Sequence, residues 1–562
     1  MSSTLITKYK AMMDTSCPHS YYPRPQFKRD SFFCLNGEWD FYLAAEGKEE
    51  VKTKILVPFC PESELSGLGI SIEGYTECAY ERSFTLPEGF ANDRVILHFG
   101  AVDQICRVYI GGNKIGEHEG GYLPFSFDIT EHIGDGEVSL RVEFLDTLDV
   151  KYPYGKQTKK RGGMWYTPVS GIWQTVWLES LPKNPVERLR IEPLSDGVKI
   201  KVYGGECEKK ILLQSGEIYE FCGDEVVIKP ENPKLWTPES PYLYNFTLTS
   251  GEDKIESYFA IRVVDIQKVD GVSRICLNGK PYVFNGLLDQ GYFPDGLFLP
   301  ATVDGYIDDI RSMKSLGFNM LRKHIKVEPM IFYYLCDREG MAVFQDMVNN
   351  GKYSFIVDTA LPTIGLQKLS DTNRHKNPES RAIFESTMYG ITDLLYNTPS
   401  VVYYTIFNEG WGQFCADEMY EKLTAKDSTR VIDATSGWFR RSKSDVDSRH
   451  IYFKPLVVKD RDDRPLVISE FGGYSYRPEG HLYGEGNYGY KDFKSIEEFR
   501  DALVGLYKNQ VLPLAVSGAS AFVYTQVSDV EDETNGLLSY DREVLKIKPE
   551  QIKPLMDEIS GY

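Results

Sequence analysis

Two stretches of this sequence have the same form: a run of apolar residues that stops at a glutamate. Residues 401–407 lead into Asn408 and Glu409, and residues 466–468 lead through Ser469 into Glu470. A carboxylate at the end of an apolar strand is costly to desolvate unless it is solvated, paired or used. Each stretch alone fits an ordinary exit from a strand into a loop. Together they predict a pair of carboxylates that work on one pocket.

Paired carboxylates can divide acid and base chemistry between them. In glycoside hydrolysis one protonates the leaving oxygen, and the other attacks the anomeric carbon or activates water. Mutual repulsion helps to raise the pKa of the acid. Clustered acids can also bind a metal, but the sequence has no H-E-x-x-H motif and no histidine pair at ligand spacing. We therefore expect no metal and no cofactor. The alternative for each glutamate is a salt-bridged rim without catalysis.

The elements that must position these residues come from the second half of the chain. Helical spacing of apolar residues alternates there with short apolar strands. We expect helices near 307–316, 329–339, 378–396, 417–424 and 497–507, and strands at 318–321, 341–344, 401–404, 431–432 and 521–524. This alternation predicts a (β/α)8 TIM barrel over residues 269–562, whose active site lies at the carboxyl ends of the strands. Besides both glutamates, Arg322, His324 and Asp346 fall at such ends.

The first half of the chain has the pattern of β-sheet proteins. Short alternating runs separated by glycine-rich turns predict a jelly-roll-like β-sandwich over residues 1–180. Residues 181–268 are the right length for one small immunoglobulin-like β-sandwich. The chain is therefore expected to contain three domains.

Composition restricts the possible partners and location. With 562 residues and a net charge of −19, the chain lacks the basic face that nucleic acid or an anionic membrane would require. No apolar run approaches the ~18 residues of a membrane-spanning helix, and the N-terminus does not have the form of a signal peptide. The 10 cysteines are isolated, which favours reduced thiols in the cytoplasm over a disulfide framework.

Several motifs follow one another along nearly the whole chain. In chain order they are LNGEWDF (35–41), VPFCPES (57–63), SGIWQTVWLE (170–179), FAIRVV (259–264), LNGKPYVFNG (277–286) and LGFNMLRKH (316–324), followed by the Asn-Glu and Ser-Glu-Phe-Gly motifs. With these motifs the chain resembles glycoside hydrolase family 2, which includes β-galactosidases, β-glucuronidases and β-mannosidases.

The resemblance implies a retaining exo-β-glycosidase. Glu409 would be the general acid/base and Glu470 the nucleophile that forms a glycosyl-enzyme. Asn408 would hydrogen-bond the 2-OH of the sugar. Arg322 and His324 match the family's Arg-x-His motif; either could contact the sugar, and Arg322 could instead orient Glu470.

Two departures from the family pattern bear on the substrate. Metal-binding β-galactosidases carry a histidine where this chain has Thr398, which places a magnesium site in doubt. β-Glucuronidases carry an Asn-x-Lys motif that grips the uronate carboxylate, whereas here Asn535 is followed by Gly536 and Leu537.

Further residues could line the sugar site. Asp289 could accept hydrogen bonds from sugar hydroxyls, and Arg477 could bind a uronate. The aromatic candidates for a sugar-binding wall are Trp411, Trp438, Tyr474 and Tyr524.

Three functions stay open from the sequence. The first is an exo-β-glycosidase of the β-galactosidase type. The second is a β-hexuronidase, acting on glucuronides or galacturonides, in which Arg477 or Lys323 replaces the missing lysine. The third is a catalytically silent carbohydrate-binding protein. In each case the expected partner is a carbohydrate, and the sequence leaves open whether the chain forms a homo-oligomer.

Overall fold

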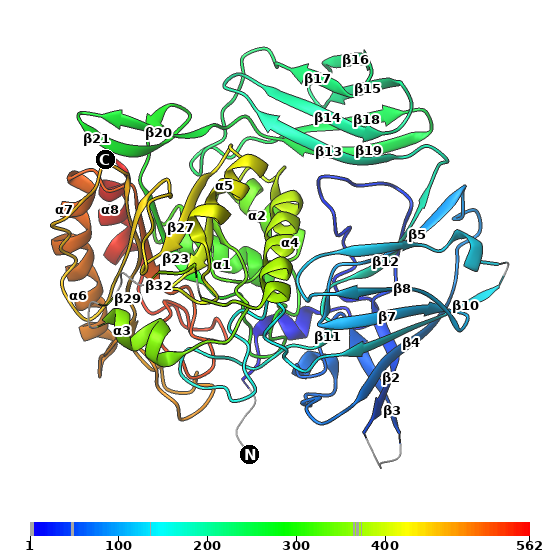
Figure 1. Ribbon diagram of the computed structural model, residues 1–562, viewed down its shortest axis with the longest axis horizontal. Coiled ribbons are helices and arrows are strands. Elements are labelled where there is room, and N and C mark those ends of the chain that lie inside the picture. Colours follow the sequence, from blue (N-terminus) through cyan, green and yellow to red (C-terminus); the bar gives the residue numbers. More distant parts are fainter. Residues whose placement is uncertain (1–4, 46–49, 135, 364–365, 367–369, 373) are drawn as a thin grey trace.

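Three bodies make up the protein in the computed structural model, which describes residues 5–45, 50–134, 136–363, 366, 370–372 and 374–562. An N-terminal β-sandwich (blue to cyan in Figure 1) lies beside the barrel, and a second sandwich (teal to green) lies across both of them. The barrel occupies the chain from green to red.

The N-terminal body is a sandwich of antiparallel sheets. Its smaller sheet has the order β1 (Phe32–Cys34), β12 (Val176–Leu181), β5 (Arg94–Phe99) and β9 (Phe125–Asp128). Its larger sheet has the order β3 (Val51–Val57), β2 (Gly37–Ala44), β4 (Glu77–Thr85), β10 (Glu137–Leu145), β7 (Ile105–Ile110) and β8 (Asn113–Glu119). A short pair joins β6 (Val102–Asp103) to β11 (Gly171–Ile172). Alternate residues of β2, among them Trp39 and Phe41, point into the core between the sheets, as period-two patterning requires.

The second body is a smaller antiparallel sandwich. One sheet contains β13 (Val186–Pro193), β14 (Val198–Gly204) and β17 (Glu225–Ile228). The other contains β16 (Ile218–Cys222), β15 (Glu208–Leu213), β18 (Tyr244–Ser250) and β19 (Asp253–Phe259). A disulfide joins Cys207 to Cys222. The expectation that the cysteines are reduced throughout is therefore wrong for this pair, because cross-strand pairing brings together two cysteines that are 15 residues apart in the sequence.

A small sheet of β20 (Val264–Val269), β21 (Val272–Leu277) and β22 (Lys280–Pro281) leads into the barrel. The eight barrel strands are all parallel and are hydrogen-bonded in the order β27 (Val431–Ser436), β26 (Val401–Asn408), β25 (Ala342–Asp346), β24 (Met320–Lys323), β23 (Phe284–Asp289), β32 (Ala521–Thr525), β29 (Leu466–Gly472) and β28 (Asp447–Ile451). The barrel is nearly closed. Between β27 and β28, Ser436 Oγ lies 3.1 Å from His450 Nε2.

Helices cover most of the barrel's outer surface. They are α1 (Asp304–Ser315), α2 (Met330–Glu339), α3 (Leu361–Thr363), α4 (Pro378–Leu395), α5 (Ala416–Lys426), α6 (Ile496–Leu506), α7 (Leu512–Val516) and α8 (Pro549–Ser560). Shorter or wider turns of helix lie at Lys8–Met12, Glu64–Ser66, Thr130–His132, Phe355–Ala360 and Tyr507–Val511, and a short strand pair joins β30 (Tyr474–Ser475) to β31 (Lys491–Asp492). Residues 437–446 and 452–465, which the structure describes in full, contain no helix. The connections after β27 and β28 therefore depart from the regular alternation.

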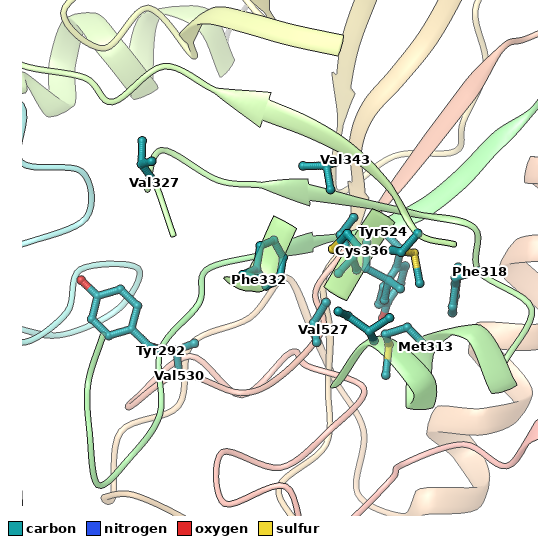
Figure 2. Packing of buried hydrophobic residues seen from close by; sticks show 14 of the residues in the cluster. Tyr292, Met313, Phe318, Val327, Phe332, Cys336, Val343, Tyr524, Val527 and Val530 are labelled. Atoms are coloured by element: carbon teal, nitrogen blue, oxygen red, sulfur yellow. The ribbon is translucent and has the colours of Figure 1, made fainter. Parts of the chain in front are cut away.

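Two apolar layers hold the barrel together. Phe284, Met320, Phe344 and Val467 fill its interior. The alternate residues of the same strands, with the inner faces of the helices, form the outer layer that Figure 2 shows around Met313, Phe332 and Tyr524. A residue's place in this alternation decides whether it faces the barrel axis or the helices. Among the described residues, no helix is long and apolar enough to cross a membrane.

Candidate active site

Arg322 joins the ends of four barrel strands. From β24 it donates to Asp346 Oδ1 on β25 (2.9 Å), to Asn408 Oδ1 on β26 (2.8 Å), and on β29 to the Ser469 carbonyl (2.9 Å) and Glu470 Oε1 (3.1 Å). Burial lowers the pKa of this guanidinium, but Asp346 and Glu470 outweigh burial and hold its pKa above the ordinary value. The fixed fork of Arg322 orients Asn408 and Glu470.

Asp346 also receives the second half of the Arg-x-His motif. Its Oδ2 lies 2.8 Å from His324 Nδ1. Burial would raise the pKa of Asp346, yet Arg322 and His324 hold it below its ordinary value. Burial lowers the pKa of His324 to about 3, so the ring is neutral near pH 7.

The two glutamates face each other across a histidine. His450 Nδ1 lies 2.9 Å from Glu409 Oε1 and 3.5 Å from Glu470 Oε2. Burial lowers the pKa of His450 to about 4, so this ring too is neutral near pH 7. The sequence did not indicate His450, because β28 carries none of the apolar alternation by which strands are recognised.

The two carboxylates have different surroundings. Burial raises the pKa of Glu409 to about 7, although Lys156 and Arg322 oppose the shift. Burial also raises the pKa of Glu470, which Glu409 raises further, while His450 and Arg322 oppose it. Tyr452 donates to Glu470 Oε2 (2.8 Å) and lies 2.7 Å from Thr525 Oγ1. Glu470 is thus held by two donors, Arg322 and Tyr452, whereas the carboxylate of Glu409 has a hydrogen bond with His450 alone among the described residues.

The glycines after Glu409 are required by the turn. Glu409 itself has a left-handed backbone with φ of 51°, an unusual conformation for a residue with a side chain. Gly410 follows at φ 76° and Gly412 at φ 66°. A Cβ on Gly412 would lie 2.3 Å from the carbonyl oxygen of Asn350, too close for any side chain. The turn lifts the Glu409 carboxylate into the site and brings Trp411 in beside it.

An aromatic wall adjoins Glu409. The Trp411 ring stacks on Trp165 (centroids 5.4 Å apart), meets Tyr353 edge to face (5.6 Å) and lies 6.3 Å from His324. The half-buried Trp438 lies 6.3 Å from the His450 ring. Both tryptophans proposed from the sequence therefore stand around the paired carboxylates.

Part of this wall comes from the N-terminal sandwich. Residues 146–170, which connect β10 to β11, extend over the barrel mouth, and we call this segment the docking loop. Its contacts include Lys151 O with Asn350 Nδ2 (2.7 Å), Tyr154 Oη with Gly351 O (2.9 Å) and Thr167 N with Glu531 Oε1 (3.0 Å). The docking loop carries Trp165 and Lys156, and Lys156 Nζ stands 4.8 Å from the centre of the Trp411 ring. Nothing in the local sequence signals this role.

Some predicted site residues lie elsewhere. Asp289 faces the helices rather than the barrel axis, and its Oδ2 binds Lys323 Nζ at 2.7 Å. The same lysine binds Glu328 Oε1 at 2.8 Å. Asp289 and Lys323 are therefore corrected from substrate contacts to members of a buried ionic cluster. The alternation along β23 and β24 turns both side chains outwards.

The prediction for the last strand also needs correction, whereas those for Arg477 and Tyr474 in the loop after β29 stay predictions. The Tyr524 ring belongs to the outer apolar layer (Figure 2), with Phe471 and Tyr507 as neighbours, so it forms no wall of the site. Arg477 donates to the carbonyl of Gly484 in its own loop (3.0 Å). Tyr474 lines an open cavity of about 310 Å³ that also has Tyr452, Phe453, Tyr490 and Lys491 in its wall.

Among the described residues, Glu409, His450 and Glu470 could together hold a cation. One oxygen or nitrogen atom from each of the three side chains lies within 4.8 Å of the other two. Thr398 has no bearing on a metal there. It precedes β26, at the opposite end of that strand from Glu409. Thr398 therefore gives no evidence against a metal, and the absence of a metal stays a prediction.

The fold and the site together define a multidomain TIM-barrel protein with paired carboxylates at the carboxyl ends of its strands. The chain belongs to glycoside hydrolase family 2. Its residues 71–182 match the family's sugar binding domain, residues 192–262 match the glycosyl hydrolases family 2 domain, and residues 268–544 match the family's TIM barrel domain.

Curated relatives of this chain include β-galactosidases. That of Thermoanaerobacter pseudethanolicus is 28% identical over 299 residues, covering 48% of this chain and 39% of the relative. That of Leuconostoc mesenteroides is 23% identical over 528 residues, covering 83% of this chain and 47% of the relative. The chain thus spans less than half the length of these curated relatives.

Similar solved structures carry other names. A β-glucuronidase from an uncultured Clostridium species has a TM-score of 0.74 at 18% identity, with 96% of this chain and 99% of that chain covered. A β-galacturonidase from Eisenbergiella tayi bound to galacturonate has a TM-score of 0.70 at 18% identity, with 97% and 99% covered. At this identity the likeness shows the shared fold.

Proposed function

We propose that the chain is a retaining exo-β-glycosidase with Glu470 as the nucleophile and Glu409 as the general acid/base. The observation that carries the proposal is the close approach of the carboxylates, which bring an oxygen each, with a nitrogen of His450, within 4.8 Å of one another. Retaining glycosidases hold these groups about 5–5.5 Å apart, whereas inverting ones leave about 6.5–9.5 Å for a water molecule. The short approach supports retention.

The reaction would proceed in two displacements. In the first, a Glu470 oxygen attacks the anomeric carbon as the bond to the leaving oxygen breaks, and Glu409 gives its proton to that oxygen. In the second, the Glu409 carboxylate takes a proton from water, whose oxygen attacks the same carbon and displaces Glu470. A pKa of about 7 suits Glu409 for both roles.

Neighbouring groups would support these steps. Arg322 and Tyr452 bind one oxygen of Glu470 each, which fixes the direction of attack. Asn408 Oδ1 accepts a hydrogen bond from Arg322, and the buried Asn408 Nδ2 has no partner among the described residues. That free donor supports the proposed hydrogen bond from Asn408 to the sugar 2-OH, a contact that strengthens in the transition state.

Two classes of glycone fit the proposal. Neutral β-galactosides are favoured by the names of the sequence relatives. β-Hexuronides are favoured by one observation, the ammonium group of Lys156, which has no acceptor among the described residues and acts on Glu409. We also propose a cytoplasmic location, on the eight cysteines that are free.

A substrate panel tests the proposal. The purified protein would be assayed with 4-nitrophenyl β-D-galactoside, glucuronide, galacturonide, glucoside and mannoside and the α-L-arabinoside, with Glu470→Gln as the matched inactive control. If the wild-type protein releases nitrophenol from one of these substrates and Glu470→Gln does not, the result supports the proposal. If no glycoside is cleaved but sugars still bind, the chain is a silent carbohydrate-binding protein.

A further inference from the structure

Lys156 is a buried lysine whose ammonium group has no hydrogen-bond acceptor. Lys156 is 7% exposed, and its Nζ forms no hydrogen bond or ion pair with a described residue, although its charge lowers the pKa of Glu409. The other buried lysines all have acceptors. Lys209 donates to two carbonyls (2.5 and 3.1 Å), and Lys323, Lys326 and Lys546 each contact a carboxylate at 2.7–2.8 Å. Its Nζ is not among the buried polar atoms without a partner, so it keeps access to solvent and can bind a ligand that displaces this solvent.

The position of Lys156 indicates which kind of group could bind its ammonium. Its Nζ lies 4.8 Å from the centre of the Trp411 ring and 5.9 Å from that of Trp165. Trp411 follows Glu409 by two residues, and its ring lies 6.3 Å from the His324 ring. The ammonium therefore stands on the Glu409 side of the site. The two indole faces attract a cation, but they supply no acceptor for its N–H groups.

We propose that Lys156 binds an anionic group of the substrate, a carboxylate carried either by the glycone or by the sugar that leaves. This inference rests on the proposed function, since it takes the sugar to lie between Glu409 and Glu470. The two cations that the sequence offered for binding a uronate both have acceptors within the protein. Lys323 is neutralised by Asp289 and Glu328, and Arg477 lies in a loop against the Gly484 carbonyl.

The net charge of the molecule does not itself attract an anionic substrate. The chain has a net charge of −19, so its overall field repels an anionic sugar. The Lys156 ammonium can still supply a charge-assisted hydrogen bond, which is stronger than a hydrogen bond between neutral groups. Because Lys156 belongs to the docking loop, substrate selection would be assigned to the sandwich and bond cleavage to the barrel.

The test compares Lys156→Met with a control from the same loop, Lys160→Met, whose side chain is exposed. The first substrate pair is 4-nitrophenyl β-D-galacturonide against the galactoside, together with the glucuronide against the glucoside. The second pair is a β-linked disaccharide with a uronic acid as its leaving sugar against its neutral counterpart. For whichever pair contains the recognised anion, Lys156→Met should lower kcat/KM roughly 10- to 100-fold more for the anionic member than for the neutral member. The neutral member also changes, because Lys156 acts on the pKa of Glu409.

The control should match the wild type on every substrate, and Lys156→Arg should retain part of the preference for the anion. Loss confined to the first pair assigns the carboxylate to the glycone, and loss confined to the second assigns it to the leaving sugar. Equal loss on anionic and neutral members, or no loss on either, would overturn the proposal.

Binding separates this inference from the proposed reaction. Calorimetry with galacturonate and galactose on Glu470→Gln, with and without Lys156→Met, does not depend on turnover. If the added Lys156→Met weakens the binding of galacturonate but not that of galactose, the result supports the anion site even if the chain cleaves no glycoside. Identical binding of galacturonate by both variants, with the disaccharide arm also unchanged, contradicts it.

Discussion

At the scale of single residues, Glu409 sets the pH dependence. Burial raises its pKa to about 7, and the first step needs it protonated, so kcat/KM should fall as the pH rises through about 7. Burial raises the pKa of Glu470 above its ordinary value of 4.5, and attack needs it ionised, so activity should also fall on the acid side. With an activated aryl glycoside, Glu409→Gln should lose the alkaline limb. A limb that persists in that variant would assign it to another group.

His450 should also affect catalysis, through its contact with Glu409. Its ring contacts Glu409 and lies 3.5 Å from Glu470, so His450→Ala removes a hydrogen bond to a catalytic carboxylate. We expect kcat/KM to fall by the equivalent of about 1.5–3 kcal/mol, with the pH limb of Glu409 displaced. Ser436→Ala, which removes only the partner of the other ring nitrogen, should have a smaller effect. Unchanged kinetics and an unchanged pH profile in His450→Ala would count against the contact.

The sequence predicted the residues that lie on regular strands. Arg322, Asp346, Asn408 and Glu470 come together because the carboxyl ends of parallel strands meet at one face of the barrel. Lys156 could not be predicted in this way. Its place depends on how two separate domains dock, and no local pattern encodes that contact.

At the scale of elements, the strands differ in how well their sequences reveal them. The apolar runs of β26 and β29 were recognised, whereas β28 reads Asp-Ser-Arg-His-Ile and was not. Its first residue, Asp447, is fully buried because Arg449 pairs with it at 2.6 Å rather than because it is apolar. A strand buried through ion pairs leaves no hydrophobic period to read, and this hid both His450 and Tyr452.

The docking loop should contribute to substrate binding through Trp165. Trp165 stacks on Trp411 and so extends the wall of the site away from the barrel. Trp165→Ala should raise KM for aryl glycosides by roughly 2- to 12-fold, the value of one aromatic contact, and change kcat less. Trp165→Phe should retain most of the affinity. A KM unaffected by Trp165→Ala would show that the docking loop does not contact the substrate.

At the scale of the whole molecule, the sandwich and the barrel share one apolar cluster. Trp173 of the sandwich packs against Phe298 of the barrel domain, with ring centres 5.0 Å apart. Each domain's class could be predicted because its own periodicity is local, either two residues in the sheets or alternating helix and strand in the barrel. The way the domains share a core and an active site could not.

We expect that the protein needs no metal ion for its activity. The proposed steps use only carboxylates and their hydrogen-bonding partners. EDTA should therefore leave kcat/KM unchanged, whereas added zinc should inhibit by occupying Glu409, His450 and Glu470. Loss of most activity with EDTA and its return with magnesium would contradict this expectation.

The most direct test of the central claim is the product formed by Glu409→Ala in the presence of azide. An activated aryl glycoside needs little protonation, so this variant should still form the glycosyl-enzyme on Glu470 and then stall. Azide needs no base, so it should restore turnover and give the β-glycosyl azide, while Glu470→Ala gives no β-azide and no turnover. An α-glycosyl azide from Glu409→Ala, or undiminished hydrolysis by Glu470→Ala, would contradict the assignment of the two glutamates.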